Sequence, residues 1–290
     1  MDAPKISIIT PSYNQAKYLE DTILSVLGQN YPNLEYLIID GGSTDGSVEI
    51  IKKYEKHLAY WVSEPDNGMY HAIQKGFDKS TGEIMAWINS DDMYHPKALY
   101  TVAEIFGSFP SVNWLQGLTT IYDESGRTVE AYKSRSFTKF DFYNYDYGFI
   151  QQESTFWRHS LWAKTGASLD CGLFYAGDFA LWLKFFSCEK LFVTNALIGG
   201  FRMRSSNQLS LDFRKEYIEE IEKLLATVTL NKKEKHILKY YRRLLVIIRF
   251  IQAFKIFRTD WLIAKYRNRY FPHSQRIEFN QFSQQFELID

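Results

Sequence analysis

Cysteine is scarce in this chain of 290 residues, because Cys171 and Cys188 are too few for a disulfide framework. The N-terminus, MDAPKISIIT, lacks the basic segment followed by an apolar stretch that a secretory signal has. Long apolar runs are also missing. The longest candidate, LLVIIRFIQAFKIF, is interrupted by Arg249 and Lys255 and is shorter than the roughly 20 residues of a membrane span. We therefore expect a cytoplasmic protein of a reducing compartment.

Net charge is zero, but the charges are unevenly distributed along the chain. Between Lys232 and Arg269, twelve Lys and Arg residues stand against two acidic ones, giving +10 (12 − 2), so the remainder sums to −10. With 46% hydrophobic residues, the chain can bury one large core plus an appendage. We expect a main domain at residues 1–210 and a basic, amphipathic helical extension at residues 211–290.

Several signatures of other enzyme classes are absent, namely a P-loop, zinc-type Cys and His spacing and a serine nucleophile elbow. Instead, strand-like runs rich in β-branched and aromatic residues alternate with helical patterns. The expected strands are residues 5–9, 34–40, 59–63 and 84–88. This βαβαβ order predicts an α/β fold, with a mostly parallel sheet flanked by helices. Ligands bind such sheets beyond the carboxyl ends of the strands.

Polar or acidic loops follow three of these strands: TPSYNQ from Thr10, DGGSTDGS from Asp40 and NSDD from Asn89. Taken singly, each loop has an ordinary explanation in helix capping or turn formation. Together they lie at one edge of the predicted sheet. That joint placement predicts a ligand site.

The segments ISIITPSYNQ, LIIDGGSTDGS, SEPDNGMYHAIQKG and MAWINSDD closely resemble family 2 glycosyltransferases of the GT-A fold. The likeness continues through QQESTFWRHSLWAKTG and GDFALWLKF, so it covers roughly Lys5 to Ser210. It implies a nucleotide-sugar donor, a divalent cation and inversion at the anomeric carbon. The transferred group would be a hexosyl or N-acetylhexosaminyl residue.

The resemblance also implies roles for individual residues. Asp66 would bind the donor, and Lys75 would contact phosphate or sugar, although Lys75 also suits a solvated helix position. Tyr13 could pack against the base or belong to the core. The base and ribose would be bound by Thr10, Pro11, Tyr13 and Asp40.

Asp91 and Asp92 resemble the Asp-x-Asp signature in which carboxylates hold Mn²⁺ or Mg²⁺ against the diphosphate. Adjacent residues of an extended chain point in opposite directions. We therefore give Asp92 the direct metal contact and Asp91 a donor-sugar or supporting role. Asp178 would be the catalytic base that takes a proton from the acceptor, or simply a helix N-cap.

One departure from the family concerns GFRMRSSNQLS, where many relatives have a histidine ligand. This chain offers Arg202, Arg204 and Asn207 there. An arginine cannot ligate a cation, but it can neutralise a diphosphate directly. We therefore expect Arg202 and Arg204 to contact the donor, and the departure puts the strictness of metal dependence in doubt.

The partners are less constrained by the sequence. A UDP-sugar is the default donor, because Asp40 suits a uracil imide, although dTDP offers the same edge and GDP remains an alternative. The acceptor would be a saccharide or a lipid-linked saccharide. A non-catalytic nucleotide-sugar scaffold and a nucleotidylyltransferase are the rival classes. The basic extension could dock on the main domain or lie against an anionic membrane surface from the cytoplasmic side. Nucleic acid is not an expected partner.

Overall fold

The computed structural model describes residues 3–135, 137–145, 147, 150–205, 208, 212–253, 265 and 275–289. Its strands are β1 (Ile6–Ser12), β2 (Leu34–Asp40), β3 (Tyr60–Ser63), β4 (Ile84–Trp87), β5 (Met93–Tyr94), β6 (Trp114–Gln116), β7 (Thr119–Tyr122), β8 (Thr128–Tyr132), β9 (Thr155–Arg158), β10 (Phe192–Thr194), β11 (Gly199–Arg202), β12 (Arg276–Asn280) and β13 (Gln285–Ile289). Its helices are α1 (Ala16–Leu27), α2 (Ser47–Tyr54), α3 (Met69–Lys79), α4 (Ala98–Ser108), α5 (Lys139–Tyr143), α6 (His159–Lys164), α7 (Gly177–Cys188), α9 (Arg214–Thr227) and α10 (Lys232–Ala253), with the 3-10 turns η1 (Glu55–His57) and η2 (Gln152–Ser154).

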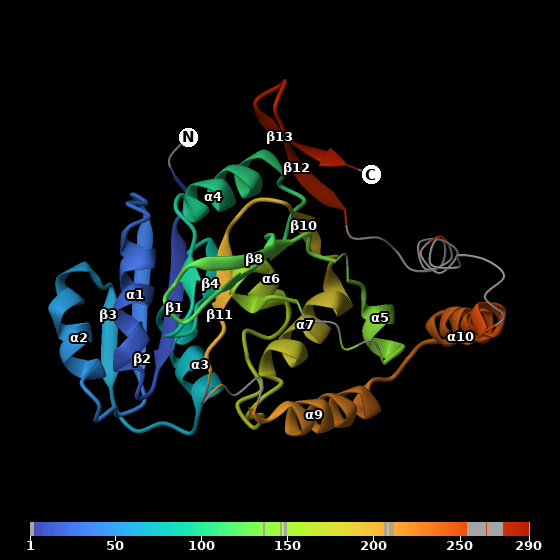
Figure 1. Ribbon diagram of the computed structural model, residues 1–290, viewed down its shortest axis with the longest axis horizontal. Coiled ribbons are helices and arrows are strands. Elements are labelled where there is room, and N and C mark those ends of the chain that lie inside the picture. The colour runs from blue at the N-terminus through green and yellow to red at the C-terminus, as the bar shows by residue number, and fades with distance from the viewer. Residues whose placement is uncertain are drawn as a thin grey trace.

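A mostly parallel sheet runs through the molecule, in the order β13-β12-β10-β6-β9-β4-β1-β2-β3 (Figure 1). Strand β1 pairs in parallel with β2 on one side and with β4 on the other. Strand β9 is antiparallel to both of its neighbours, β4 and β6. The predicted βαβαβ order and the α/β class are therefore confirmed. Ser12 lies in register with Asp40, so the loops after β1 and β2 emerge side by side.

Helices cover both faces of this sheet because alternate strand residues point to opposite sides. On one face Ile9, Leu37 and Trp87 pack with residues of α3, α6 and α7. On the other, Ile8 and Ile38 pack with residues of α1, α2 and α4. The polar residues that the strands carry at their carboxyl ends are thereby held between two rigid apolar layers.

A smaller sheet, β5-β11-β7-β8, lies beside the main one. Strand β11 pairs in an antiparallel manner with β5, which follows the Asp91-Asp92 turn directly, and in parallel with β7. The sheet therefore brings the segment around Arg202 next to the turn after β4, although the two are more than a hundred residues apart in sequence.

We had expected the segment after residue 210 to be a helical extension. The structure shows that it is not helical throughout. Helix α9 packs beside α7 and buries Ile221 in the main core, and the buried Leu238 and Tyr241 of α10 pack with Phe140 of α5. The chain ends in the hairpin β12–β13, and β12 pairs in parallel with β10 of the main sheet. The hairpin stands away from α10 in Figure 1. Because this pairing is made across about 80 residues, charge and local periodicity did not reveal it.

The division of the chain at residue 210 stays a prediction, since residues 209–211 lie outside the described part. Within the described residues, no helix combines the length and apolarity needed to cross a bilayer.

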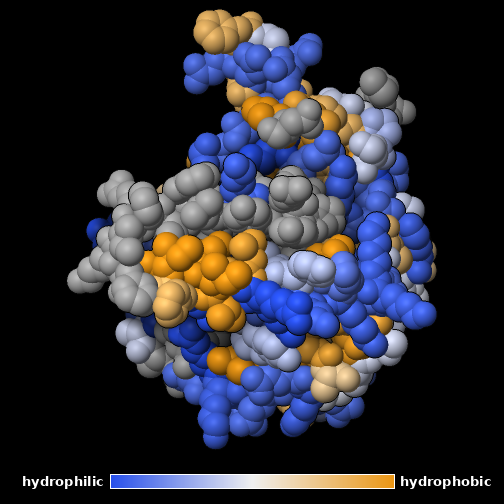
Figure 2. All heavy atoms as spheres, turned by 90° about the vertical axis from the view of Figure 1, so that its right-hand side faces the viewer, coloured by the Kyte–Doolittle hydropathy of each residue, from blue (hydrophilic) through white to orange (hydrophobic). Residues whose placement is uncertain are grey.

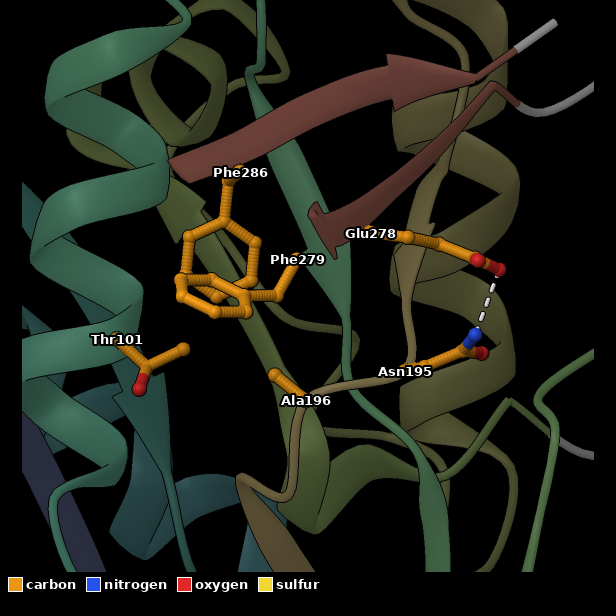
Figure 3. Close-up of a pocket in the computed structure, with 6 residues that line it drawn as sticks. All are labelled: Thr101, Asn195, Ala196, Glu278, Phe279 and Phe286. Atoms are coloured by element: carbon orange, nitrogen blue, oxygen red, sulfur yellow. Dashed lines mark hydrogen bonds between the residues drawn. The ribbon is translucent and has the colours of Figure 1, made fainter. Parts of the chain in front are cut away.

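A small pocket of about 260 Å³ lies between α4, the segment after β10 and the terminal hairpin (Figure 3). Phe279 and Phe286 form one wall, and Asn195 donates a hydrogen bond of 2.6 Å to Glu278 at the other. The carboxylate of Glu278 is also 3.8 Å from the ammonium of Lys133. Since its one ionisable group is already paired, this pocket is a weak candidate for a catalytic site.

Candidate active site

A cleft of about 780 Å³ opens at the carboxyl ends of β1, β2 and β4, where the sequence analysis placed the ligand site. Its lining includes residues from the loops after these strands, from η2, from the start of α7 and from α9. Of the predicted site residues, the cleft is lined by Pro11, Tyr13, Asp66, Asp91, Asp178 and Arg204. Thr10, Asp40, Lys75, Asp92 and Arg202 are not among the described residues that line it.

Tyr13, Gly41 and Asp66 form one end of the cleft. Tyr13 is 64% exposed, which excludes the core position that we had considered for it. Asp66 accepts a hydrogen bond of 2.8 Å from the Gly68 N–H through Oδ1. A Cβ at Gly41 would lie only 2.9 Å from Asp66 Oδ2 and 3.3 Å from the Tyr13 ring. The missing side chain at Gly41 thus lets a carboxylate and an aromatic ring meet in one pocket.

Asp40 and Thr10 shape this pocket from behind and do not face the cleft. Asp40 is fully buried and accepts hydrogen bonds from the Gly42 N–H (3.1 Å), the Ser43 N–H (2.8 Å) and the Ser63 hydroxyl (2.7 Å). Thr10 Oγ1 lies 3.0 Å from the Tyr36 hydroxyl oxygen. The carboxylate of Asp40 folds the following loop, as Asp commonly does in turns, and the base contact expected of it stays a prediction.

Asp91 and Asp92 lie in different surroundings, and the metal contact expected of Asp92 stays a prediction. The Asp91 carboxylate lines the cleft and lies 3.1 Å from Arg204 Nη2. Asp92 is 1% exposed and accepts hydrogen bonds from the Arg202 N–H (2.8 Å) and from Asn89 Nδ2 (3.1 Å). The carboxylate that could contact a ligand is that of Asp91.

Burial raises the pKa of both carboxyls, because desolvation disfavours the charged form. For Asp91 the positive charge of Arg204 opposes this increase. For Asp92 the negative charges of Glu153 and Asp91 add to it, so its pKa lies well above the usual range. Burial likewise raises the pKa of Glu153, a further cleft residue, to about 7.

Arg202 is 1% exposed and braces the Asp91-Asp92 turn from behind. Its Nε donates to the Asp91 carbonyl (2.7 Å), and its Nη2 lies 3.0 Å from Asp21 Oδ2. The guanidinium of Arg202 is bonded within the fold, and the donor contact expected of it stays a prediction. Arg204, two residues on, does line the cleft. Asn207 lies outside the described residues.

Lys75 also fails to reach the cleft. Its ammonium lies 2.7 Å from Glu64 Oε1, and the side chain is on α3. The predicted phosphate or sugar contact is thus not supported by its position, and the solvated-helix interpretation fits better.

Asp178 lies in the first turn of α7 and lines the cleft. Leu181, Trp182 and Phe185 of this helix are buried, as the sequence predicted. Asp178 Oδ1 accepts a hydrogen bond of 2.7 Å from the Phe179 N–H. Burial raises the pKa of Asp178 to about 6, and the nearby charge of Glu220 acts in the same direction.

Helix α9 completes the site. The sequence analysis did not predict this contribution, because it assigned the helix to the extension. Arg214 and Tyr217 line the cleft. Glu220 accepts hydrogen bonds from the N–H groups of Phe174 (3.0 Å), Tyr175 (2.9 Å) and Ala176 (2.8 Å). One carboxylate thereby fixes the loop that leads into Asp178.

The described residues contain no group of three or more His, Cys, Asp or Glu side chains placed to hold a metal ion by themselves. Mn²⁺ and Mg²⁺ are commonly bound by one or two carboxylates together with substrate phosphates, so a complete protein cage is not required. Asp91 offers carboxylate oxygens at the cleft, and the carboxyl groups of Glu153 and the buried Asp92 are close enough for their charges to interact. These residues fit a cation that is held jointly with a diphosphate.

Comparisons with known proteins agree with this architecture. A Staphylococcus aureus protein, TarS, solved in complex with UDP-GlcNAc, superposes with a TM-score of 0.63 at 20% identity, over 81% of this chain and 70% of that chain. The mannosyltransferase PcManGT from Pyrobaculum calidifontis, solved with GDP-Man and Mn²⁺, gives a TM-score of 0.61 at 16% identity, over 81% of this chain and 68% of the other. At these identities, the likeness establishes the fold.

Sequence relatives match part of the chain. An uncharacterized glycosyltransferase from Nostoc sp. is 33% identical over 129 residues, which are 43% of this chain and 40% of the relative. The Bacillus subtilis glycosyltransferase TuaG, provisionally assigned to teichuronic acid biosynthesis, is 41% identical over 96 residues, 31% of this chain and 37% of the relative. The matches thus span less than half of each relative's length. The sequence pattern described as Glycosyl transferase family 2 matches residues 7–176, more than half of the 290 residues, and the chain belongs to this family.

Proposed function

We propose that this chain is an inverting glycosyltransferase that moves a hexosyl or N-acetylhexosaminyl group from a nucleoside diphosphate sugar to an acceptor hydroxyl. The observation that supports this most is the composition of a single cleft. It holds a pocket formed by the aromatic Tyr13 and the acidic Asp66, the positively charged side chain of Arg204, and the buried carboxylate of Asp178. These features suit, in turn, a nucleoside, a diphosphate and an acceptor hydroxyl.

Asp66 replaces Asp40 as the residue that recognises the base in this proposal. Its Oδ2 lies beside Gly41 and Tyr13, where a base could stack on the tyrosine ring and donate an imide N–H to the carboxylate. A UDP-sugar fits this arrangement, because uracil has such an imide. TarS was solved with UDP-GlcNAc and PcManGT with GDP-Man, so the fold accommodates both bases.

In the transfer step, Asp178 accepts the proton of the acceptor hydroxyl as its oxygen forms a bond to the anomeric carbon. The bond between that carbon and the diphosphate oxygen breaks on the opposite face, which inverts the configuration. Arg204 lies on the diphosphate side of the cleft and stabilises the negative charge that the leaving group acquires. Asp91 would hold Mn²⁺ or Mg²⁺ there, and a bound cation supplies further charge stabilisation as a Lewis acid.

The acceptor side of the cleft is built by aromatic residues of the α7 and α9 regions. Phe174, Tyr175 and Tyr217 line it, and aromatic faces are suited to packing against sugar rings. A saccharide, free or linked to a lipid, is therefore the acceptor class that we propose.

Peripheral contact with an anionic lipid surface is a further part of the proposal. Figure 2, viewed from the α10 side, shows apolar residues gathered beside hydrophilic ones. On α10, Val246 and Ile247 are 69% and 57% exposed, and the neighbouring Arg243 and Arg249 are also exposed. The inward face of the same helix is docked on α5. Of the aromatic and basic run at residues 261–271, only Lys265 belongs to the described part.

The test of the proposed function is release of nucleoside diphosphate from a panel of UDP- and GDP-sugars with Mn²⁺ and saccharide acceptors. We expect turnover with at least one donor and its loss in Asp178→Asn. If wild-type protein binds a nucleotide sugar but the variant turns over equally, Asp178 is not the base. Binding without turnover for any donor and acceptor would favour the scaffold alternative.

A further inference from the structure

Arg204 lines the cleft from the segment that follows β11. It lies two residues beyond the end of that strand, so strand pairing does not position its side chain. Its Nη1 donates to Gln15 Oε1 (3.2 Å), and its Nη2 lies 3.1 Å from Asp91 Oδ2. An arginine side chain loses considerable rotamer freedom when it binds a ligand. Contacts that fix the guanidinium beforehand therefore strengthen binding.

The aromatic ring of Tyr18 supplies a further contact of this kind. Tyr18 lies in the first turn of α1, is 7% exposed and is not among the described residues that line the cleft. The Cζ atom of Arg204 lies over this ring, 5.5 Å from the centroid, and that of Arg202 lies 5.1 Å from it. Guanidinium groups at this range are attracted to the ring. Because a ring contacts the face of a guanidinium, the N–H groups of Arg204 stay available for phosphate oxygens.

Glu124, in the loop between β7 and β8, fixes the Tyr18 ring in turn. The Tyr18 hydroxyl donates to Glu124 Oε1 at 2.7 Å, and the Lys17 ammonium pairs with the same carboxylate. These two hydrogen bonds lower the pKa of Glu124 to about 2, so the carboxylate stays ionised. Glu124 also accepts from the Ser205 hydroxyl (3.1 Å), next to Arg204 in the chain. One carboxylate thus joins α1 to the segment that carries Arg204.

The surroundings of Tyr18 differ from those of the other buried residues of α1. Leu19, Ile23 and Val26 pack in the apolar layer on one face of the main sheet. Tyr18 instead contacts charged groups, including the Lys17 ammonium at 4.9 Å from its ring centroid. The ring is therefore placed for binding cations more than for filling the core.

Tyr54 of α2 provides an internal comparison. Its hydroxyl donates to Glu20 Oε1 at 2.7 Å, and the Lys53 ammonium lies 5.3 Å from its ring centroid. These contacts repeat those of Tyr18 with Glu124 and Lys17. Among the described contacts, arginines lie over the ring of Tyr18 and not over that of Tyr54. The two tyrosines thus differ mainly in the arginine pair.

We infer that Tyr18 is a positioning residue for diphosphate binding, because its ring, fixed by Glu124, holds the guanidinium of Arg204 at the cleft. This inference rests on the proposed function, in which Arg204 stabilises the leaving nucleoside diphosphate. It goes beyond that proposal, since it assigns a role to a residue outside the cleft lining. The guanidinium is placed before the donor arrives, so ordering it costs less on binding.

Single variants separate the ring from the hydroxyl and from general packing. Tyr18→Leu removes the ring, and Tyr18→Met, whose flexible apolar side chain fills irregular gaps, replaces it if the leucine variant does not fold. Tyr18→Phe keeps the ring and loses only the hydrogen bond to Glu124. The matched control is Tyr54→Leu, which removes a tyrosine with the same kinds of acid and lysine contacts.

The quantity to measure is the gain in affinity from nucleoside monophosphate to nucleoside diphosphate. Calorimetry with UMP and UDP, and with GMP and GDP, in the presence of Mn²⁺ at pH 8 gives this gain. Arg204→Met should reduce it by about thirtyfold, since it removes a charged hydrogen-bond donor. Tyr18→Leu should reduce it by about fivefold, as expected for a largely desolvated contact between a cation and a ring. Tyr18→Phe and Tyr54→Leu should each change it by less than about twofold.

The double variant Tyr18→Leu/Arg204→Met shows whether Tyr18 acts through Arg204. If it does, removal of the ring has no further effect once the guanidinium is gone, and the double variant binds like Arg204→Met. A purely structural role of Tyr18 would instead lower the affinities for monophosphate and diphosphate alike. Its effect would also add to that of Arg204→Met.

The outcomes separate this inference from the proposed function. The role of the ring is overturned if Tyr18→Leu keeps the full gain, if Tyr18→Phe loses as much, or if the effect of Tyr18→Leu persists in the double variant. It is also overturned if Arg204→Met binds diphosphate as tightly as wild type, while the proposed function survives that result. If the wild-type protein binds no nucleotide at all, the proposed function fails and the role of Tyr18 fails with it.

Discussion

At the scale of single residues, burial of the Asp178 carboxyl changes both its pKa and the stability of the fold. Its carboxyl has a pKa of about 6 in the fold, against 3.8 for an ordinary Asp, mainly because burial disfavours the charge. The folded state therefore holds this proton more tightly than the unfolded chain, and the associated stability is lost as pH rises from about 4 through 6. A shift of this size is worth about 3 kcal/mol at 1.36 kcal/mol per pH unit.

Asp178→Asn should consequently separate activity from stability. Turnover should fall by about 10²-fold or more, because a positioned base contributes that much. The free energy of unfolding at pH 8 should increase, by up to about 3 kcal/mol, since the amide need not be ionised. Urea denaturation beside a turnover assay measures both. A variant that is inactive but less stable than wild type would indicate a structural role for the carboxylate.

The pH dependence follows from the same residue. The base must be ionised, so kcat should decline about tenfold per pH unit below about pH 6 and level off above it. A profile of kcat from pH 4.5 to 8.5, on protein shown by circular dichroism to stay folded, checks this. If kcat instead declined only around pH 4, the carboxyl of Asp178 would not stay buried in the donor-bound site.

At the scale of elements, α9 holds the loop that precedes Asp178 through Glu220. Its carboxylate binds three successive N–H groups at residues 174–176 and also raises the pKa of Asp178. Glu220→Gln should therefore lower kcat by about tenfold, leave nucleotide affinity unchanged and move the acidic limb of the pH profile to lower pH. The shift of the limb is the readout that a purely structural role would not produce.

The control for this prediction is the adjacent Glu219→Gln. Glu219 makes an exposed i,i+4 pair with Lys215 on the same helix, and such pairs contribute little. We expect wild-type kinetics from it. Equal effects of the two variants would mean that α9 tolerates no loss of charge, and the specific role of Glu220 would be abandoned.

At the scale of the whole molecule, the basic C-terminal segment is partly docked and partly outward-facing. Since α9 lines the cleft, truncation after residue 210 would damage the active site and is a poor test of membrane binding. Co-sedimentation of the full chain with anionic and neutral liposomes at low salt is better. Basic residues near an anionic surface contribute about 1 kcal/mol each, so we expect a clear preference for anionic vesicles.

The double variant Val246→Asn/Ile247→Asn should weaken this binding, because it removes two exposed apolar side chains from the basic face of α10. Phe282→Asn is the matched control, since Phe282 is fully exposed but lies in the C-terminal hairpin. If the full chain shows no preference for anionic vesicles, or if both variants bind like wild type, α10 is simply a docked helix with a solvated face.

The sequence by itself determined the sheet, the edge at which ligands bind and the chemistry of the loops there. Period-2 runs located β1 to β4, because side-chain alternation along a strand is a local property. Tyr13 and Asp91 lie in loops that follow two of these strands, whereas Asp66 and Asp178 were predicted from the resemblance to family 2 glycosyltransferases.

Only the tertiary structure decided which member of each neighbouring pair lines the cleft. Asp40 and Asp92 turned inward, and Gly41 and Asp91 outward, because the carboxylates of Asp40 and Asp92 satisfy backbone N–H groups that burial would otherwise leave unpaired. The guanidinium of Arg202 likewise pairs with Asp21 and donates a hydrogen bond to the Asp91 carbonyl. The roles of Tyr18, Glu220 and the terminal hairpin depend on contacts between distant segments, which no local pattern of residues records.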